Sequence, residues 1–361
     1  MGKWFSPFYV TIALAILFIA SAFTSFADKT NMLALYITLS FITIFIHELG
    51  HVVFALLAGY HFHFMIIGPI TIENNSKLKI VPNHRWGMFG GAAYCMPKNT
   101  DSELTKKHLW YAAGGPLFSL GTATIFLIIW LFIDHVFIFT TFLLNAAIFF
   151  VTTLPTKMSG GLYSDGYICL MLIRGGKKAE QYVATLLLSK ELMSPKKPLE
   201  WSKSFIEEAK GVAPSTDHIL AAYTIFYYEL SANGFEAASQ TIDAYKMIPL
   251  TNKNKLLLQL ITQVRQIDSY SSDNPDAELI AALHKQLSKV EPISYKRSEA
   301  LLASLQGNEK LAEKRLQEAI EQCEQGIQQY GFLEAEKQLT AFVYNLVQTH
   351  AAKSPIRSAN L

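Results

Sequence analysis

Hydrophobic positions divide the chain into two unlike halves. Four apolar stretches lie in the first half, at residues 7–27, 32–59, 109–133 and 136–154. Each is long enough to cross a hydrocarbon core of ~30 Å at ~1.5 Å per helical residue. The pattern therefore predicts four transmembrane helices. We expect the first to be retained and not removed as a signal peptide, because its apolar run is long and further spans follow.

Two short runs between the second and third spans have strand character. Residues 61–72 are rich in β-branched and aromatic side chains, and residues 78–81 follow after a polar turn. This pattern predicts a small β-hairpin. Gly68 and Pro69 favour a bend or an edge strand, so the hairpin is expected at the membrane surface with one side unpaired.

The second half predicts a soluble, all-α domain. From residue 179 onward, apolar residues recur at helical spacing among Lys, Glu and Gln. Two similar stretches begin with the turns Asn233-Gly234 and Gly307-Asn308 and continue with small residues. Such turns are typical of tetratricopeptide-like repeats, but the spacing is irregular and a plain helical bundle stays open. The predicted boundary separates a membrane domain, residues 1–176, from a helical domain, residues 177–361.

Charge places both ends of the chain on one side of the membrane. The segment between spans two and three carries six basic residues: Lys77, Lys79, Arg85, Lys98, Lys106 and Lys107. Basic loops favour the cytoplasmic side, so an even number of spans predicts cytoplasmic N- and C-termini. The formal charge of +2, with no basic face interleaved with aromatics, argues against a nucleic-acid partner. Three widely spaced cysteines predict neither a disulfide framework nor cysteine chemistry.

The second span contains the motif His47-Glu48-Leu49-Gly50-His51. Two histidines four residues apart share one face of a helix, which is the arrangement that a single Zn²⁺ requires. The glutamate between them is placed to act as a general base. Burying these three side chains in an apolar helix costs several kcal/mol unless they bind a metal ion, pair with other polar groups or face a water-filled cavity. Metal binding is therefore favoured over a purely structural role.

A third ligand is needed, and Asp165 is the best candidate. Most other carboxylates lie far from membrane depth, and Asp134 is predicted in a turn on the opposite side. An Asp-Gly pair is ordinarily a turn. Here the flanking residues are apolar over residues 160–172, as an interruption or a continuation of the fourth segment. These flanks favour a ligand held within the membrane.

These motifs resemble the site-2 proteases, which are intramembrane zinc metalloproteases. His47, Glu48 and His51 match the first motif of that family, and Pro155 with Asp165-Gly166 matches the second. Gly114-Gly115-Pro116 is similar to the motif that opens another helix of the family. The resemblance covers residues 32–174 and implies a multi-pass protein, as in the bacterial plasma membrane, with a membrane-surface β element.

The second motif departs from the family pattern in two ways. Thr152 stands where the family usually has asparagine, and the interval from Pro155 to Asp165 is several residues longer than usual. We predict that Thr152 supplies a hydrogen bond to substrate or to the backbone in place of the asparagine, or that Asn145, one or two turns earlier, does so. His61 and His63 alternate along the hairpin, either as interfacial polar residues or as a second metal pair.

The sequence thus predicts cleavage of peptide bonds in or near transmembrane segments of membrane-protein or signal-peptide substrates. Glu48 is the expected general base, and His47, His51 and Asp165 are the expected Zn²⁺ ligands. The helical domain would bind a protein partner, and the spans would contact the lipid bilayer. One alternative is a membrane scaffold or receptor without catalysis that acts through the helical domain. A transporter is a weaker alternative, because four spans show no internal duplication.

Overall fold

The computed structural model divides the chain into two compact units. The first runs to Lys157 and resumes from Tyr163 to Ala179, and the second continues from Glu180. Helices make up most of both units, and one antiparallel sheet belongs to the first. The structure describes residues 5–74, 77–84, 86–98, 103–157, 163–252 and 254–353.

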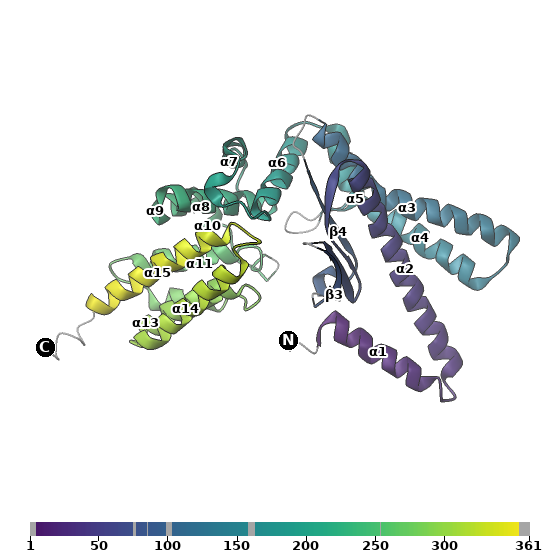
Figure 1. Cartoon of the computed structure of the whole chain (residues 1–361), viewed down its shortest axis with the longest axis horizontal. Helices are drawn as coiled ribbons and strands as arrows, with labels where there is room; N and C mark the ends of the chain where they lie inside the picture. Colours follow the sequence, from purple (N-terminus) through teal and green to yellow (C-terminus); the bar gives the residue numbers. More distant parts are fainter. Residues whose placement is uncertain are drawn as a thin grey trace. The chain divides into compact units, whose positions relative to one another are not determined.

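Three helices of the first unit are long and apolar enough to cross a membrane: α2 (Ala27–Leu57), α3 (Leu104–Phe132) and α4 (Val136–Thr153). α2 packs against α3, which runs beside α4 (Figure 1). The predicted first span is α1 (Pro7–Ser21), an apolar helix of 15 residues, which is about 22 Å long. Three of the four predicted spans are therefore present, and the first is shorter than predicted.

Two membrane helices begin at other residues than the sequence predicts. α2 begins at Ala27, earlier than predicted, after a turn in which the Ser21 hydroxyl donates to the Thr30 hydroxyl at 2.6 Å. α3 begins at Leu104, so Pro116 lies inside the helix and not at its start. The polar first turn of α3 is missed by an apolar pattern because a helix can extend beyond the hydrocarbon core.

The element between α2 and α3 is a four-stranded antiparallel sheet, which contains the predicted hairpin around the polar turn and adds further pairing to it. Its strands are β1 (Tyr60–Ile67), β2 (Ile70–Asn74), β3 (Leu78–Pro82) and β4 (Ala92–Pro97), in the order β3-β2-β1-β4. The predicted first strand divides at Gly68, whose φ of 52° suits a glycine turn. The sequence does not predict β4, because its small and apolar residues lack a polar alternation.

The apolar segment after α4 becomes a separate helix. Pro155 disfavours helical conformation in the residue before it, and α4 ends at Thr153. The next helix, α5 (Asp165–Arg174), begins at the predicted third ligand. Residues 160–162 of the predicted continuation lie outside the described residues.

The second unit is helical throughout its described part. Its main apolar core lies among α8, α11, α13 and α15 and includes Phe226, Ile267, Leu301 and Leu339. From the junction onward the helices are α6 (Lys177–Leu192), α7 (Lys203–Lys210), α8 (Ile219–Asn233), α9 (Phe235–Thr241), α10 (Asp243–Lys246), α11 (Gln259–Ser271), α12 (Ala277–His284), α13 (Pro292–Leu305), α14 (Glu309–Gly326) and α15 (Leu333–Lys353), with short 3₁₀ turns at Pro198–Glu200 and Thr216–His218.

The two similar stretches of sequence are turns between packed helices. Gly234 separates α8 from α9 with a φ of 88°, and Gly307 lies between α13 and α14 with a φ of 74°. Both values require a residue without a side chain. The partner helices differ in length, because α9 has 7 residues and α14 has 18. The turns therefore recur without a regular repeat of helix length.

A buried ion pair joins three helices of the second unit. Arg297 of α13 has no exposed side-chain surface and lies 2.5 Å from Glu336 Oε2 of α15. Tyr227 of α8 donates its hydroxyl to the other oxygen of Glu336 at 2.5 Å. Arg297 also donates to Thr340 Oγ1 at 3.1 Å. In a water-free interior, each of these groups depends on the others to compensate its lost hydration.

Replacing Arg297 by Met should therefore destabilise the second unit by about 3–5 kcal/mol, because Glu336 would be left buried without its cation. Arg315→Met is the matched control. Arg315 pairs with Glu299 and Glu318 at the surface, where such pairs contribute up to about 1 kcal/mol. The full chain is denatured with urea in detergent, and unfolding of the second unit is followed by its proteolysis. The urea midpoint is then compared between the two variants. Equal midpoints for the two variants would contradict the prediction.

Candidate metal centre

The two histidines of the motif lie side by side on α2. They are four residues apart, so their side chains leave the same face of the helix. Their Nε2 atoms are 3.3 Å apart, and both residues are buried. The helix alone therefore presents two nitrogen ligands to one point.

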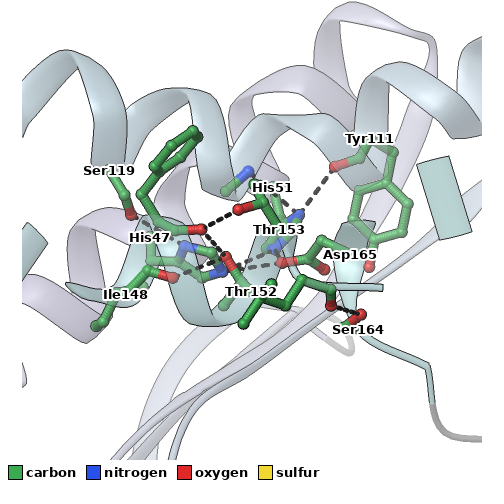
Figure 2. A network of polar contacts seen from close by, with 12 residues as sticks. His47, His51, Tyr111, Ser119, Ile148, Thr152, Thr153, Ser164 and Asp165 are labelled. Carbon is green, nitrogen blue, oxygen red and sulfur yellow. Dashed lines mark hydrogen bonds and ion pairs between the residues drawn. The ribbon is translucent and has the colours of Figure 1, made fainter. Parts of the chain in front are cut away.

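Asp165 comes to this point from α5, more than a hundred residues later in the chain. Its Oδ2 lies 3.2 Å from His47 Nε2 and 3.4 Å from His51 Nε2, and Figure 2 shows the three side chains pointing toward one another. Tetrahedral zinc with ligands at about 2.0–2.1 Å requires ligand atoms about 3.3 Å apart. The three separations fit that requirement, and among the described residues this is the only such group of three.

The second nitrogen of each histidine has its own partner on α3. His51 Nδ1 lies 2.9 Å from the Tyr111 carbonyl, and His47 Nδ1 lies 3.0 Å from Ser119 Oγ (Figure 2). A carbonyl only accepts, so a proton on His51 Nδ1 would bond to Tyr111 and leave Nε2 with the lone pair that a metal ion needs. Partners of this kind fix the tautomer and orientation of metal-binding histidines. The sequence analysis missed Tyr111 and Ser119; Ser119 is a polar residue in an apolar span, whereas a main-chain carbonyl leaves no signal.

Gly115 of α3 leaves open the space between the two rings. A Cβ at this position would lie 2.3 Å from His51 Nε2 and 2.7 Å from His47 Nε2. It would occupy the region where the three candidate ligand atoms converge. The glycines of Gly114-Gly115-Pro116 thus have a structural explanation. They let α3 approach α2 closely without covering the two histidine nitrogens.

Replacing Gly115 by Ala should prevent metal binding while leaving the protein folded. The added methyl group would collide with both nitrogens, and the expected loss of zinc affinity is more than ~100-fold. Gly121→Ala is the control on the same helix, because nothing lies within 4 Å of a Cβ there. Zinc content after dialysis against a metal buffer measures the effect. Full zinc occupancy in Gly115→Ala would contradict the predicted position of the metal.

Ser164 places Asp165 by joining the end of α4 to the start of α5. Its hydroxyl donates to the Leu154 carbonyl at 2.6 Å and accepts from Thr156 N at 3.0 Å. It also accepts from Tyr167 N at 3.3 Å, as the N-cap of α5. Three contacts through one oxygen therefore hold the chain beside the aspartate.

Ser164→Ala should lower zinc affinity about 10- to 100-fold, the usual effect of losing a group that orients a ligand. Ser164→Thr keeps the hydroxyl and should retain most of the affinity. Titration with a competing fluorescent zinc chelator measures both variants. Equal weakening by alanine and threonine would show that the hydroxyl is not what positions Asp165.

The Glu48 side chain extends from α2 and is buried beside the residue that precedes β4. Gly91, immediately before β4, has a φ of 110°, and a Cβ there would lie 2.5 Å from Glu48 Oε1. The carboxylate therefore lies against the main chain of the strand that ends the sheet. The Asp165 side chain keeps 18% of its surface exposed, so the candidate metal centre is not fully enclosed by protein on that side.

The two residues predicted to contact substrate both donate hydrogen bonds to carbonyls of their own helix. Thr152 donates its hydroxyl to the Ile148 carbonyl of its own helix at 2.9 Å. Asn145 is fully buried, donates to the Thr141 carbonyl at 2.8 Å and lies 3.5 Å from Thr43 Oγ1. Its Oδ1 has no hydrogen-bond partner in the described structure. The substrate roles of both residues stay predictions.

His61 and His63 lie at the register shift between β1 and β4. Their ring centroids are 5.7 Å apart, and the His63 ring is also 5.7 Å from that of Tyr94. Burial and the neighbouring His61 lower the pKa of His63. No third metal-binding side chain joins the pair within the part of the chain that is described.

Fold and site together define a membrane protein with a candidate metal centre inside its helices. The chain belongs to peptidase family M50, the site-2 protease family, whose model matches residues 34–350. The match indicates a metal-dependent membrane protease in general, and it extends into α15, well beyond the motifs at residues 32–174. The resemblance noted in the sequence is thereby confirmed. No curated protein and no solved structure matches the chain.

Proposed function

We propose that the chain is an intramembrane zinc endopeptidase that hydrolyses peptide bonds in or near transmembrane segments of membrane-protein or signal-peptide substrates. The observation that carries this proposal is the triangle of His47 Nε2, His51 Nε2 and Asp165 Oδ2, with sides of 3.2–3.4 Å. These three atoms would hold the ion. Zinc held there supplies Lewis-acid chemistry toward water and toward the scissile carbonyl oxygen.

Glu48 is the proposed general base. It follows His47 directly on α2, and no other carboxylate among the described residues lies on the same helix next to the histidines. Its carboxylate takes a proton from the attacking water and passes it to the nitrogen of the departing peptide. The oxygen of the water ends on the new carboxyl group, so the reaction consumes one water for each bond broken.

The free side of β4 is the proposed place for the substrate chain. A helix in lipid has its carbonyls paired, so a substrate span must unwind before attack. An unwound segment can recover its hydrogen bonds by adding to an exposed strand edge. Within the described part of the sheet, β4 is the last strand beside β1 and begins next to Glu48, which makes it better placed than β3 at the other end of the sheet.

Membrane placement and partners complete the proposal. α1 would join α2, α3 and α4 as a fourth, short membrane helix, in a bacterial plasma membrane with both termini cytoplasmic. The helical domain from residue 177 onward, with its recurring glycine turns, would present a tetratricopeptide-like surface to a protein partner. Thr152 would assist substrate binding only after a local change, because its hydroxyl is bonded within α4, whereas Asn145 has an Oδ1 without a hydrogen-bond partner in the described structure.

Glu48→Gln should abolish cleavage while zinc binding persists, because the amide cannot take up a proton. The expected loss of rate is at least ~10²- to 10⁴-fold. Glu73→Gln in β2 is the control for loss of one carboxylate. Purified protein in detergent would be incubated with single-span model substrates that carry a Gly-Pro pair in the span, and products identified by mass spectrometry. Undiminished cleavage by Glu48→Gln would defeat the proteolytic mechanism.

The rival function, a membrane scaffold without catalysis, predicts a different result for the unmodified chain. A scaffold with an unused site would purify without stoichiometric zinc and would cleave none of the model substrates. The site combines three converging candidate ligands, oriented histidine rings and an adjacent carboxylate. This combination favours the protease, because burying such polar groups costs free energy and a scaffold has no use for them.

A further inference from the structure

Tyr111 connects the candidate metal centre to the sheet. Its main-chain carbonyl accepts a hydrogen bond from His51 Nδ1 at 2.9 Å. Its phenol hydroxyl donates to the carbonyl of Ala93, in β4, at 2.6 Å. One residue of α3 is therefore bonded to a candidate metal ligand at one end and to the edge strand at the other.

Neighbouring rings restrict the movement of the Tyr111 side chain. Its ring centroid lies 5.1 Å from that of His108 and 5.7 Å from that of Tyr60. These two neighbours are almost fully buried, and Tyr60 Oη lies 3.2 Å from His108 Nδ1. The His51 ring also packs edge-on against the Tyr111 ring, at 5.7 Å. The phenol consequently has a fixed direction toward β4.

We propose that Tyr111 is a positioning residue, which sets the distance between β4 and the metal centre so that a bound substrate strand presents its carbonyl to the ion. This inference rests on the proposed function. β4 is the end strand of the described sheet, beside β1, so its pairing with β1 by itself does not fix its distance from α3. Misplacement of a reacting group by ~1 Å can reduce a rate ~100-fold, so a bond that fixes the strand relative to His51 has catalytic value.

Tyr111→Phe isolates this bond. Phenylalanine keeps the ring packing, and the carbonyl that accepts from His51 belongs to the main chain and is unchanged. Zinc content should therefore stay the same. Amides of residues 92–96 should exchange with deuterium faster in the zinc-free variant than in zinc-free unmodified protein, because β4 has lost one anchor.

Two zinc-binding inhibitors separate positioning from metal binding. Acetohydroxamate reaches only the ion, whereas a peptidyl hydroxamate must also lie along the strand. Tyr111→Phe should bind acetohydroxamate as the unmodified chain does, and bind the peptidyl compound ~10-fold more weakly, the usual effect of one lost buried hydrogen bond. With a cleavable substrate, kcat should fall more than KM changes.

Tyr60→Phe is the matched control, because its hydroxyl belongs to the same cluster of rings and lies 3.2 Å from His108 Nδ1. It should leave the ratio of the two affinities unchanged. Equal weakening of both inhibitors by Tyr111→Phe, or no weakening, would overturn the inference alone. An unmodified chain that binds neither zinc nor acetohydroxamate would overturn the proposed function, and the inference with it.

Discussion

The first unit depends on one constraint: two histidines and an aspartate must share a small space between helices that are otherwise apolar. In such surroundings every unpaired polar group costs several kcal/mol, and water is scarce. The side chains compensate one another, since Asp165 lies within 3.4 Å of both Nε2 atoms. The remaining ring nitrogens face Ser119 and the Tyr111 carbonyl on α3. The positions of α2, α3 and α5 are therefore set together, because each supplies part of one polar cluster.

Close helix approach follows from the same constraint. Ligands that converge within about 3.3 Å bring their backbones nearer than large side chains allow. A Cβ on Gly50 would lie 2.3 Å from the Gly114 carbonyl, and a Cβ on Gly114 would lie 2.4 Å from the Gly50 carbonyl. At the other side of the centre, a Cβ on Gly166 would meet the Thr153 carbonyl. Glycine at these crossings allows close contact between helices, whereas Gly115 leaves the space between the histidine rings open.

The sequence predicted those parts of the site that are local or chemically conspicuous. His47 and His51 are placed by helical periodicity, and Asp165 was found because a carboxylate among apolar residues is costly. The sheet was predicted poorly, because β4 pairs with a distant strand and lacks an alternating pattern. Tyr111 was missed because its contact with His51 uses a main-chain atom, which every residue has. Periodicity therefore locates the ligands, but the groups that orient them come from tertiary packing and carry no signature of their own.

The longer interval between Pro155 and Asp165 is compatible with the same centre because the chain returns on itself. Lys157 and Tyr163 form an isolated antiparallel bridge, and Ser164 reaches back to the Leu154 carbonyl at 2.6 Å. Additional residues are thereby accommodated between two bonded points without displacing the aspartate. Thr152 is bonded to its own helix, so a side-chain contact to substrate from this position would need that bond to break. The main chain of β4, which begins beside Glu48, offers donors and acceptors without such a rearrangement. Under the proposed function, substrate alignment would therefore rely on strand pairing more than on an asparagine side chain.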